Sequence, residues 1–226
     1  MSTDRVRGAG PQRMRLGLIA ALFVLASVAV SGLLSAGPST TAKATALDRF
    51  LEGLDSWQAE FTQTVTDSRG RARPAERGRL LIERPGKFRW EIGGTQVMVA
   101  DGLNLWFHDL DLDQITVKPA TRSLAATPAS LLAGSVPLRT QFRVAATGSR
   151  AGLEWVTVTP VASSAEFREA RLAFSGRDLR RMELTDTLGQ RVVLEFPSSR
   201  RNVPIAANAL RFVPPPGVDV IGTPLE

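Results

Sequence analysis

The side chains that could carry catalysis or bind a metal ion are few and poorly grouped. The chain of 226 residues has no cysteine and one histidine, His108, which lies between Phe107 and Asp109. Without cysteine there is no thiol nucleophile, disulfide, zinc–cysteine site or iron–sulfur site. A single imidazole also lacks the second group that a metal site or a nucleophilic pair needs. We therefore interpret His108 as a structural residue.

One acidic segment has part of the spacing of a calcium loop. Asp109, Asp111 and Asp113 alternate like the first ligands of such a loop. However, Gln114 stands where the loop needs its glycine and Ala120 where it needs its bidentate glutamate. A hairpin turn explains the segment better. The sequence also lacks G-x-S-x-G, H-E-x-x-H and a glycine-rich phosphate loop. Carboxylates on many strands leave a glycosidase-like pair open, but no spacing indicates one. We predict no enzyme activity, no metal and no cofactor.

The basic charge is concentrated at the N-terminus. The formal net charge is +6, and residues 1–44 carry five basic residues against one acidic residue, which leaves only +2 for the remainder. The basic pairs Arg180-Arg181 and Arg200-Arg201 are typical of solvated turns. A nucleic-acid partner is therefore not predicted.

The N-terminal segment has the pattern of an export signal. Basic residues end at Arg15, an apolar run extends from Leu16 to Leu34, and Ala42-Lys43-Ala44 provides a small-x-small cleavage site. The run is also just long enough to be an uncleaved membrane anchor. We expect residues 1–44 to be a signal peptide, or an anchor, with a spacer. Residues 45–226 then form one soluble domain beyond the cytoplasmic membrane.

Two short segments have helical spacing. In residues 45–54, Leu47, Phe50, Leu51 and Leu54 form one apolar stripe. The second segment, residues 128–133, has a capping threonine before it and Gly134 after it.

Most of the remaining chain alternates between apolar and polar residues, which predicts strands. About eleven are expected, joined by turns too short for crossover helices, so the sheet should be antiparallel. They are centred on residues 57–65, 80–82, 88–92, 97–99, 103–107, 115–117, 153–157, 172–174, 182–184, 192–196 and 210–212.

A sheet of this size exposes a long apolar face that two short helices cannot cover. It should therefore curl toward a barrel, with an interior either filled by side chains or partly open for an apolar guest. Both interiors are compatible with the residues. The large side chains available to fill it are Phe61, Phe88, Trp90, Phe107, Trp155, Phe174 and Phe196.

An ordered set of motifs extends over residues 46–221. It consists of Phe61-Thr62-Gln63, the run from Glu83 to Trp90, Ala100-Asp101-Gly102 with Trp106, Thr127-Pro128-Ala129 with Leu131-Leu132, Asp186 with Leu188-Gly189-Gln190, and Phe212 with Pro214 to Asp219. Each piece alone is weak, but their order is specific. The set resembles the LolA family of periplasmic carriers of outer-membrane lipoproteins.

The resemblance implies an incomplete antiparallel β-barrel closed by a short helical lid over an apolar cavity that takes acyl chains. Arg84 matches the arginine that holds the lid by hydrogen bonds, and its guanidinium has enough donors for carbonyls at the end of a short helix near Leu132 to Gly134. Phe88 matches an aromatic position implicated in receiving cargo. The expected cargo-binding residues are Phe61, Phe88, Trp90, Val97, Val99, Leu131 and Leu132.

The implied function is that of a monomeric periplasmic chaperone. It would bind acylated lipoproteins released by an ABC transporter of the inner membrane and carry them to an outer-membrane acceptor. The alternative is a fixed envelope module of the same barrel type that binds or senses lipid, which a retained anchor would favour. The related outer-membrane receptor fits less well, because it is acylated on a cysteine. The chain also ends soon after Asp219, without the extension of some carriers, which leaves the acceptor open.

Overall fold

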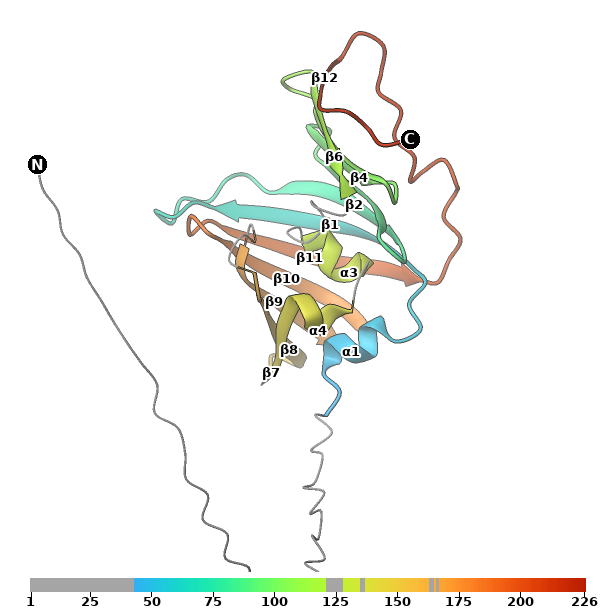
Figure 1. The fold of residues 1–226 in the computed structure, drawn as a ribbon. Helices are drawn as coiled ribbons and strands as arrows, with labels where there is room; N and C mark the ends of the chain where they lie inside the picture. The colour runs from blue at the N-terminus through green and yellow to red at the C-terminus, as the bar shows by residue number, and fades with distance from the viewer. Residues whose placement is uncertain (1–42, 121–127, 135–136, 163–164, 166) are drawn as a thin grey trace, which may run out of the picture. The chain divides into compact units, whose positions relative to one another are not determined.

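One curved, open sheet dominates the computed structural model (Figure 1). The structure describes residues 43–120, 128–134, 137–162, 165 and 167–226, so the predicted signal or anchor segment lies almost entirely outside the described residues. Within these residues, no helix has the length and apolar character needed to cross a membrane.

Twelve described strands form the sheet in the order β12-β6-β5-β4-β3-β2-β1-β11-β10-β9-β8-β7. Strands β12 and β7 are its ends, and no pairing among the described strands closes it into a barrel. The mainly β, incomplete-barrel prediction is therefore confirmed. The strands are β1 (Ser56–Thr66), β2 (Glu76–Glu83), β3 (Lys87–Ile92), β4 (Gln96–Ala100), β5 (Asn104–Asp109), β6 (Gln114–Pro119), β7 (Phe142–Arg150), β8 (Leu153–Pro160), β9 (Phe167–Ser175), β10 (Asp178–Asp186), β11 (Arg191–Arg201) and β12 (Asp219–Ile221).

Three details of the strand prediction are wrong. The residues 210–212 are not a strand, because Leu210 and Phe212 pack as side chains of an irregular segment. Strand β7 was missed, since it is an exposed edge strand without an alternating apolar pattern. Strand β12 was missed as well, and it pairs with β6 in parallel, so the sheet is not wholly antiparallel.

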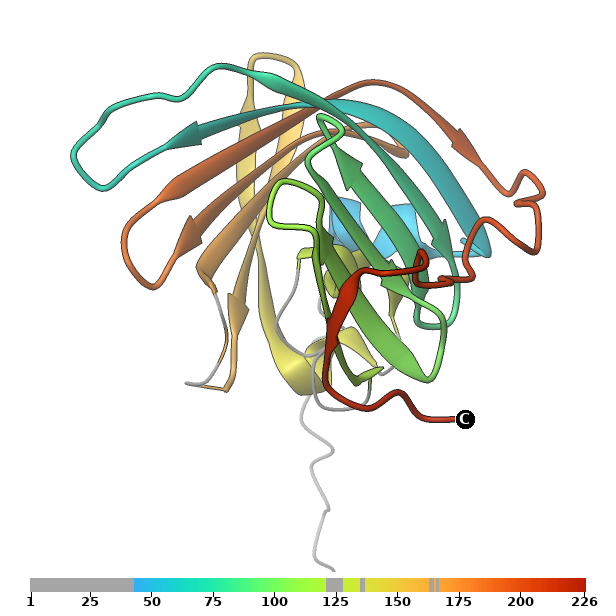
Figure 2. The ribbon, with the colours of Figure 1, turned by 90° about the horizontal axis from the view of Figure 1, so that it is seen from above.

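Three short helices of the described residues lie on the concave side of the sheet (Figure 2). They are α1 (Ala46–Leu51), α3 (Pro128–Ala133) and α4 (Leu138–Gln141). α1 contacts β8 and β9, α3 contacts β2 and β3, and α4 contacts β7. Thr45 and Asp48 form a reciprocal capping box that starts α1, as expected for threonine before an apolar stripe. The second predicted helix, over residues 128–133, is confirmed as α3.

The main core fills the concave face and joins α1 to the middle of the sheet. Phe50 meets Trp57 edge-on with ring centroids 5.7 Å apart, and Trp57 meets Phe196 at 5.2 Å. Phe61 continues the series, 6.1 Å from Phe196 and 5.2 Å from Trp90. Such edge contacts add to the stabilisation from burial alone. These five aromatic side chains therefore pack against one another in a continuous series across the concave face.

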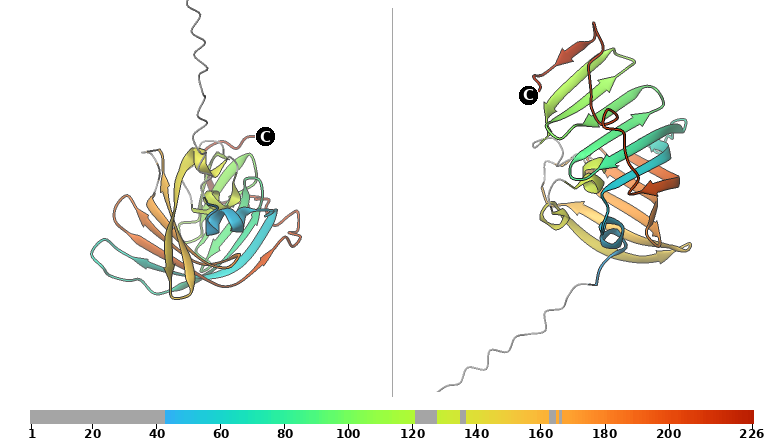
Figure 3. Two further views of the ribbon diagram at one scale, coloured as in Figure 1. Left: turned by 90° about the horizontal axis from the view of Figure 1, so that it is seen from below. Right: turned by 90° about the vertical axis from the view of Figure 1, so that its right-hand side faces the viewer.

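A second apolar cluster lies on the outer, convex face of β4–β6. It contains Val99, Trp106, Ile115 and Val117, with Val97, Phe212 and Val218 packed against them. The segment that follows β11 crosses this face (Figure 3), and Phe212 stacks on Trp106 with a centroid distance of 5.2 Å. The sheet therefore has two apolar faces in this region rather than the single face expected.

Trp155, one of the side chains expected to fill the interior, does not do so. The neighbouring residues Val156 and Val158 face the main core, so Trp155 points outward. The guanidinium groups of Arg150 and Arg171 lie 5.0 and 5.5 Å from the centre of its ring. The alternating pattern identified the strand but not which of its faces was inside.

Candidate functional site

Arg84 lies in the tight turn between β2 and β3, against the C-terminal ends of two helices. Its backbone N–H donates to the carbonyl oxygen of Asp55 at 2.8 Å. Its side-chain Nη1 donates to the carbonyl oxygen of Leu51, the last residue of α1, at 3.1 Å. Burial lowers the pKa of this guanidinium, and the nearby charge of Asp55 opposes that shift. The side chain is thus a partly desolvated cation whose recorded partner is a helix-terminal carbonyl.

The same guanidinium is in close contact with the end of α3. Gly134 has a φ of +55°, and a Cβ atom built on it would lie 2.6 Å from Nη2 of Arg84. Only glycine combines this backbone conformation with such a close approach. In the adjacent turn, the N–H of Gly86 donates to the carbonyl oxygen of Ala133 at 3.0 Å. Arg84 therefore lies at the boundary between α1 and α3. The hydrogen bond to the carbonyl oxygen of Ala133 in α3, however, comes from Gly86 and not from Arg84.

Five of the seven predicted cargo-binding residues belong to the main core, three on the sheet and two in α3. Phe88 and Leu132 are fully buried, and the others are at most 8% exposed. They are Phe61, Phe88 and Trp90 on the sheet and Leu131 and Leu132 on α3. α3 packs on β2 and β3 over part of this core.

Val97 and Val99 lie apart from this group, on the outer face of β4. Phe88 pairs with Ala100 and Trp90 with Met98, so Ala100 and Met98 are the β4 residues on the concave face. We correct the predicted positions of the two valines accordingly. Both faces of β4 are apolar, so its sequence alone does not show which face is inside. The pairing of β4 with β3, which sets Met98 opposite Trp90, is what identifies the inward face.

The chain matches the family model "Outer membrane lipoprotein carrier protein LolA" over residues 52–213. The protein belongs to the LolA family. An outer-membrane lipoprotein carrier protein from Dechloromonas aromatica is 40% identical over 178 residues, covering 78% of this chain and 86% of that protein. The protein of the same name from Chromobacterium violaceum is 35% identical and covers 88% of this chain and 97% of that one. A solved LolA superfamily protein from Nitrosomonas europaea has a TM-score of 0.42 and 12% identity, covering 74% of this chain and 96% of that one.

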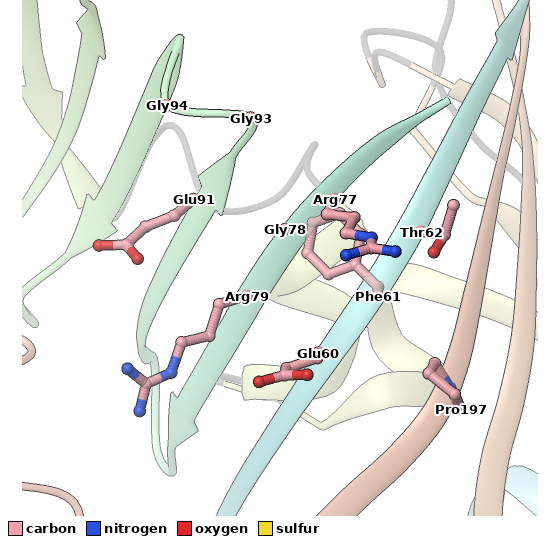
Figure 4. Close-up of a pocket in the computed structure, with 10 residues that line it drawn as sticks. All are labelled: Glu60, Phe61, Thr62, Arg77, Gly78, Arg79, Glu91, Gly93, Gly94 and Pro197. Atoms are coloured by element: carbon pink, nitrogen blue, oxygen red, sulfur yellow. The ribbon is translucent and has the colours of Figure 1, made fainter. Parts of the chain in front are cut away.

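The outer face of this LolA-family sheet carries a polar groove of about 670 Å³ between β1, β2 and β3. Glu60, Arg77, Arg79 and Glu91 line it (Figure 4). The strand register places Arg79 between the two glutamates. Binding of an acyl chain in such a charged groove is unfavourable, because covering the charged groups with hydrocarbon removes their solvation. The concave face is therefore the better candidate for an apolar ligand.

The described residues contain no group of three or more histidine, cysteine, aspartate or glutamate side chains arranged to hold a metal ion. His108 is buried on the outer face of β5, where its ring meets Phe212 at a centroid distance of 6.0 Å. That packing agrees with the structural role predicted for it.

Proposed function

We propose that this protein is a periplasmic carrier that binds the acyl chains of lipoproteins released from the inner membrane and takes them to the outer membrane. Membership of the LolA family supports the proposal. The observation that carries it is the shared burial of Phe61, Phe88, Trp90, Leu131 and Leu132 in one apolar core, where α3 packs on β2 and β3. Acyl chains would replace α3 in this contact.

The energetics of lipid transfer explain why such a surface is needed. Burying a methylene group contributes about 0.8 kcal/mol, so a long acyl chain prefers an apolar site over water by on the order of 10 kcal/mol. A lipoprotein therefore does not cross the periplasm unaided. A carrier must also give up its cargo, and contact with a movable helix is easier to reverse than enclosure in a rigid cavity.

Arg84 is the proposed latch of this cover. It joins the β2–β3 turn to Leu51 of α1 and lies against Gly134 at the end of α3. A hydrogen bond from a charged group contributes about 1.5–3 kcal/mol, which holds a cover closed but allows it to open.

The remaining parts of the proposal concern location and partners. Residues 1–44 act as an export signal, with cleavage after Ala44 leaving the folded domain in the periplasm. The cargo comes from an ABC transporter of the inner membrane and goes to an acceptor at the outer membrane. The carrier works as a monomer and binds no nucleic acid.

The test is release of newly made lipoproteins from spheroplasts by purified residues 45–226, followed by native mass spectrometry of the soluble fraction. The expected species is one carrier with one acylated lipoprotein. Leu132→Asp, which puts a charge at a fully buried position of α3, should abolish release. Leu188→Asp is the matched control, because Leu188 is 83% exposed. Binding of free lipid without lipoprotein release would support the fixed lipid-binding module instead.

A further inference from the structure

The C-terminal end of α1 is held by arginines from three separate parts of the sheet. The last carbonyl groups of a helix have no partners within the helix and need donors from elsewhere. Here the carbonyl oxygens of four successive residues are all satisfied by guanidinium groups. Arg177 Nε donates to Arg49 at 3.1 Å, Arg201 Nη1 to Phe50 at 2.7 Å, Arg84 Nη1 to Leu51 at 3.1 Å, and Arg177 and Arg201 both donate to Glu52, at 3.2 and 3.3 Å.

Arg177 and Arg201 each make a further contact at the end of α1. Arg177 is in the β9–β10 turn, where its Nη2 also binds the carboxylate of Glu52 at 2.8 Å. Arg201 is the last residue of β11, and its guanidinium lies 5.1 Å from the centre of the Phe50 ring. Burial and the charge of Arg177 both lower the pKa of Arg201, whereas Asp178 opposes that shift. Two like charges are thus held close together at the end of one short helix.

The N-terminal end of α1 is also fixed by polar contacts. Asp48 of the capping box accepts a bond from Arg139 of α4 at 2.8 Å, and Arg49 donates to Glu154 of β8 at 2.7 Å. Both ends of α1 are therefore attached to surrounding elements.

α3 is attached differently. Among the described residues, the N–H of Gly86 donates to the carbonyl oxygen of Ala133 at the end of α3, and Leu131 and Leu132 of α3 are buried in the main core. The guanidinium of Arg84 separates the end of this helix from the end of α1.

We propose that Arg177 and Arg201 are positioning residues that keep α1 on the sheet while α3 moves away, so that the carrier opens between Arg84 and Gly134. Arg84 keeps its bond to Leu51 and loses its contact with α3. This inference rests on the proposed carrier function and specifies which helix moves. Phe50 and Leu47 of α1 then form a fixed wall of the opened site, since both are fully buried against the sheet.

The test measures two distances by pulsed spin-label spectroscopy, which is simple because the chain has no native cysteine. One pair, Glu52→Cys with Leu188→Cys, reports α1 against the β10–β11 turn. It removes the exposed Glu52 carboxylate that Arg177 binds but leaves the backbone carbonyl of residue 52 in place. The other, Ser130→Cys with Leu188→Cys, reports α3. The probe is a purified triacylated lipoprotein, and binding is verified separately by native mass spectrometry. We expect the first distance to stay the same and the second to change when lipoprotein binds.

A shift of the first distance together with the second, or of the first alone, overturns the inference and leaves the carrier function intact. An unchanged second distance in a verified complex overturns it as well. If no complex with lipoprotein forms, the proposed function fails and the inference fails with it.

Variants provide an independent test. Arg177→Gln with Arg201→Gln should broaden the α1 distance distribution and reduce lipoprotein transfer by on the order of tenfold, because several charged hydrogen bonds are lost together. Arg180→Gln is the matched control: Arg180 also donates to a sheet carbonyl, that of Pro197 at 3.1 Å, but not to α1. Arg201→Lys, which keeps the charge, should rescue part of the loss. An unchanged distribution and transfer rate in the double variant would contradict the proposal.

Discussion

The helices α1 and α3 cover the same concave face, but different forces hold them. α1 has directional bonds at both ends, from Arg84, Arg177 and Arg201 at one and through its capping box at the other. α3 contributes buried leucines and one recorded backbone bond to the sheet among the described residues. Apolar contact is not directional, so an acyl chain can replace it, whereas a set of bonds to specific carbonyls cannot be exchanged for lipid. α1 can therefore stay on the sheet as a fixed side of the site, whereas α3 can move away to open it.

The largest effect is expected from removing core volume under the fixed helix. Phe50 is fully buried, with Trp57 and Phe174 both at 5.7 Å, so Phe50→Ala should lower the free energy of unfolding by about 3–5 kcal/mol. Leu132→Ala should cost only about 2 kcal/mol, the low end for a buried leucine, because α3 can detach without unfolding the sheet. Urea denaturation of both variants measures this difference. An equal or larger loss from Leu132→Ala would contradict the distinction between the helices.

The next effect concerns the boundary between them. Arg84→Leu removes the hydrogen bond to Leu51 and the close contact with Gly134, so α3 no longer returns to its closed position against the β2–β3 turn. Transfer of bound lipoprotein to acceptor membranes should fall by at least about tenfold, which corresponds to roughly 1.4 kcal/mol. Arg79→Leu, on the outer face, should transfer normally. Wild-type transfer by Arg84→Leu would show that the latch assignment is wrong.

Two glycines distinguish the end of α1 from the end of α3. Gly53 and Gly134 follow α1 and α3 with φ values of +60° and +55°, so alanine at either should cost about 1 kcal/mol of backbone strain. Only at Gly134 would the new Cβ collide with Arg84, since nothing lies within 4 Å of the corresponding position at Gly53. Gly134→Ala should therefore change the rate at which a fluorescent fatty acid enters the protein, and Gly53→Ala should not. Equal rates in both variants would argue against opening at Gly134.

The smallest effect is a pH dependence of the local stability of α1. Burial alone raises the pKa of Asp48, but bonds from Thr45 and the charge of Arg139 outweigh burial and lower it overall. Because the folded pKa lies below that of the unfolded chain, this stabilisation is complete above about pH 4 and is lost as pH falls through the folded pKa.

Hydrogen exchange should therefore show α1 loosening in acid before α3, whose sequence contains no acidic residue. Glu183 has the same sign of shift: burial raises its pKa, whereas bonds from Arg181 and Arg191 lower it overall. The comparison must therefore use the exchange rates of individual amide groups in α1 and α3 rather than the global stability of the protein. Asp48→Asn should remove the effect on α1, and its persistence in that variant would assign it to another group.

The sequence predicted those parts of the site that depend on local pattern. The bounds of α3 and the shared burial of Phe61, Phe88 and Trp90 follow from spacing and alternation. Arg84 was singled out by the family resemblance, which placed its carbonyl partner near the end of α3, whereas its hydrogen bond goes to Leu51 of α1. The face of β4 could not be predicted, because valines and inward residues are both apolar there and only the pairing with β3 distinguishes them.

The contacts that hold α1 were missed for a different reason. Arg201 belongs to a basic pair that is typical of a solvated turn, yet it bonds Phe50, which lies 151 residues earlier in the chain. No local pattern in the sequence encodes a partner at that separation. The register of β1 against β11 brings Arg201 beside the start of β1, just after α1.

The most direct test of the central claim is photo-crosslinking from the cargo itself. A lipoprotein whose acyl chains carry a diazirine group is loaded onto the carrier, irradiated, and the modified residues are identified by mass spectrometry. We predict modification of Phe88, Leu131 and Leu132, where α3 meets the sheet, with Arg77 and Arg79 unmodified. Modification concentrated in the outer groove around Arg77 and Arg79, with the α3 contact unmodified, would contradict it.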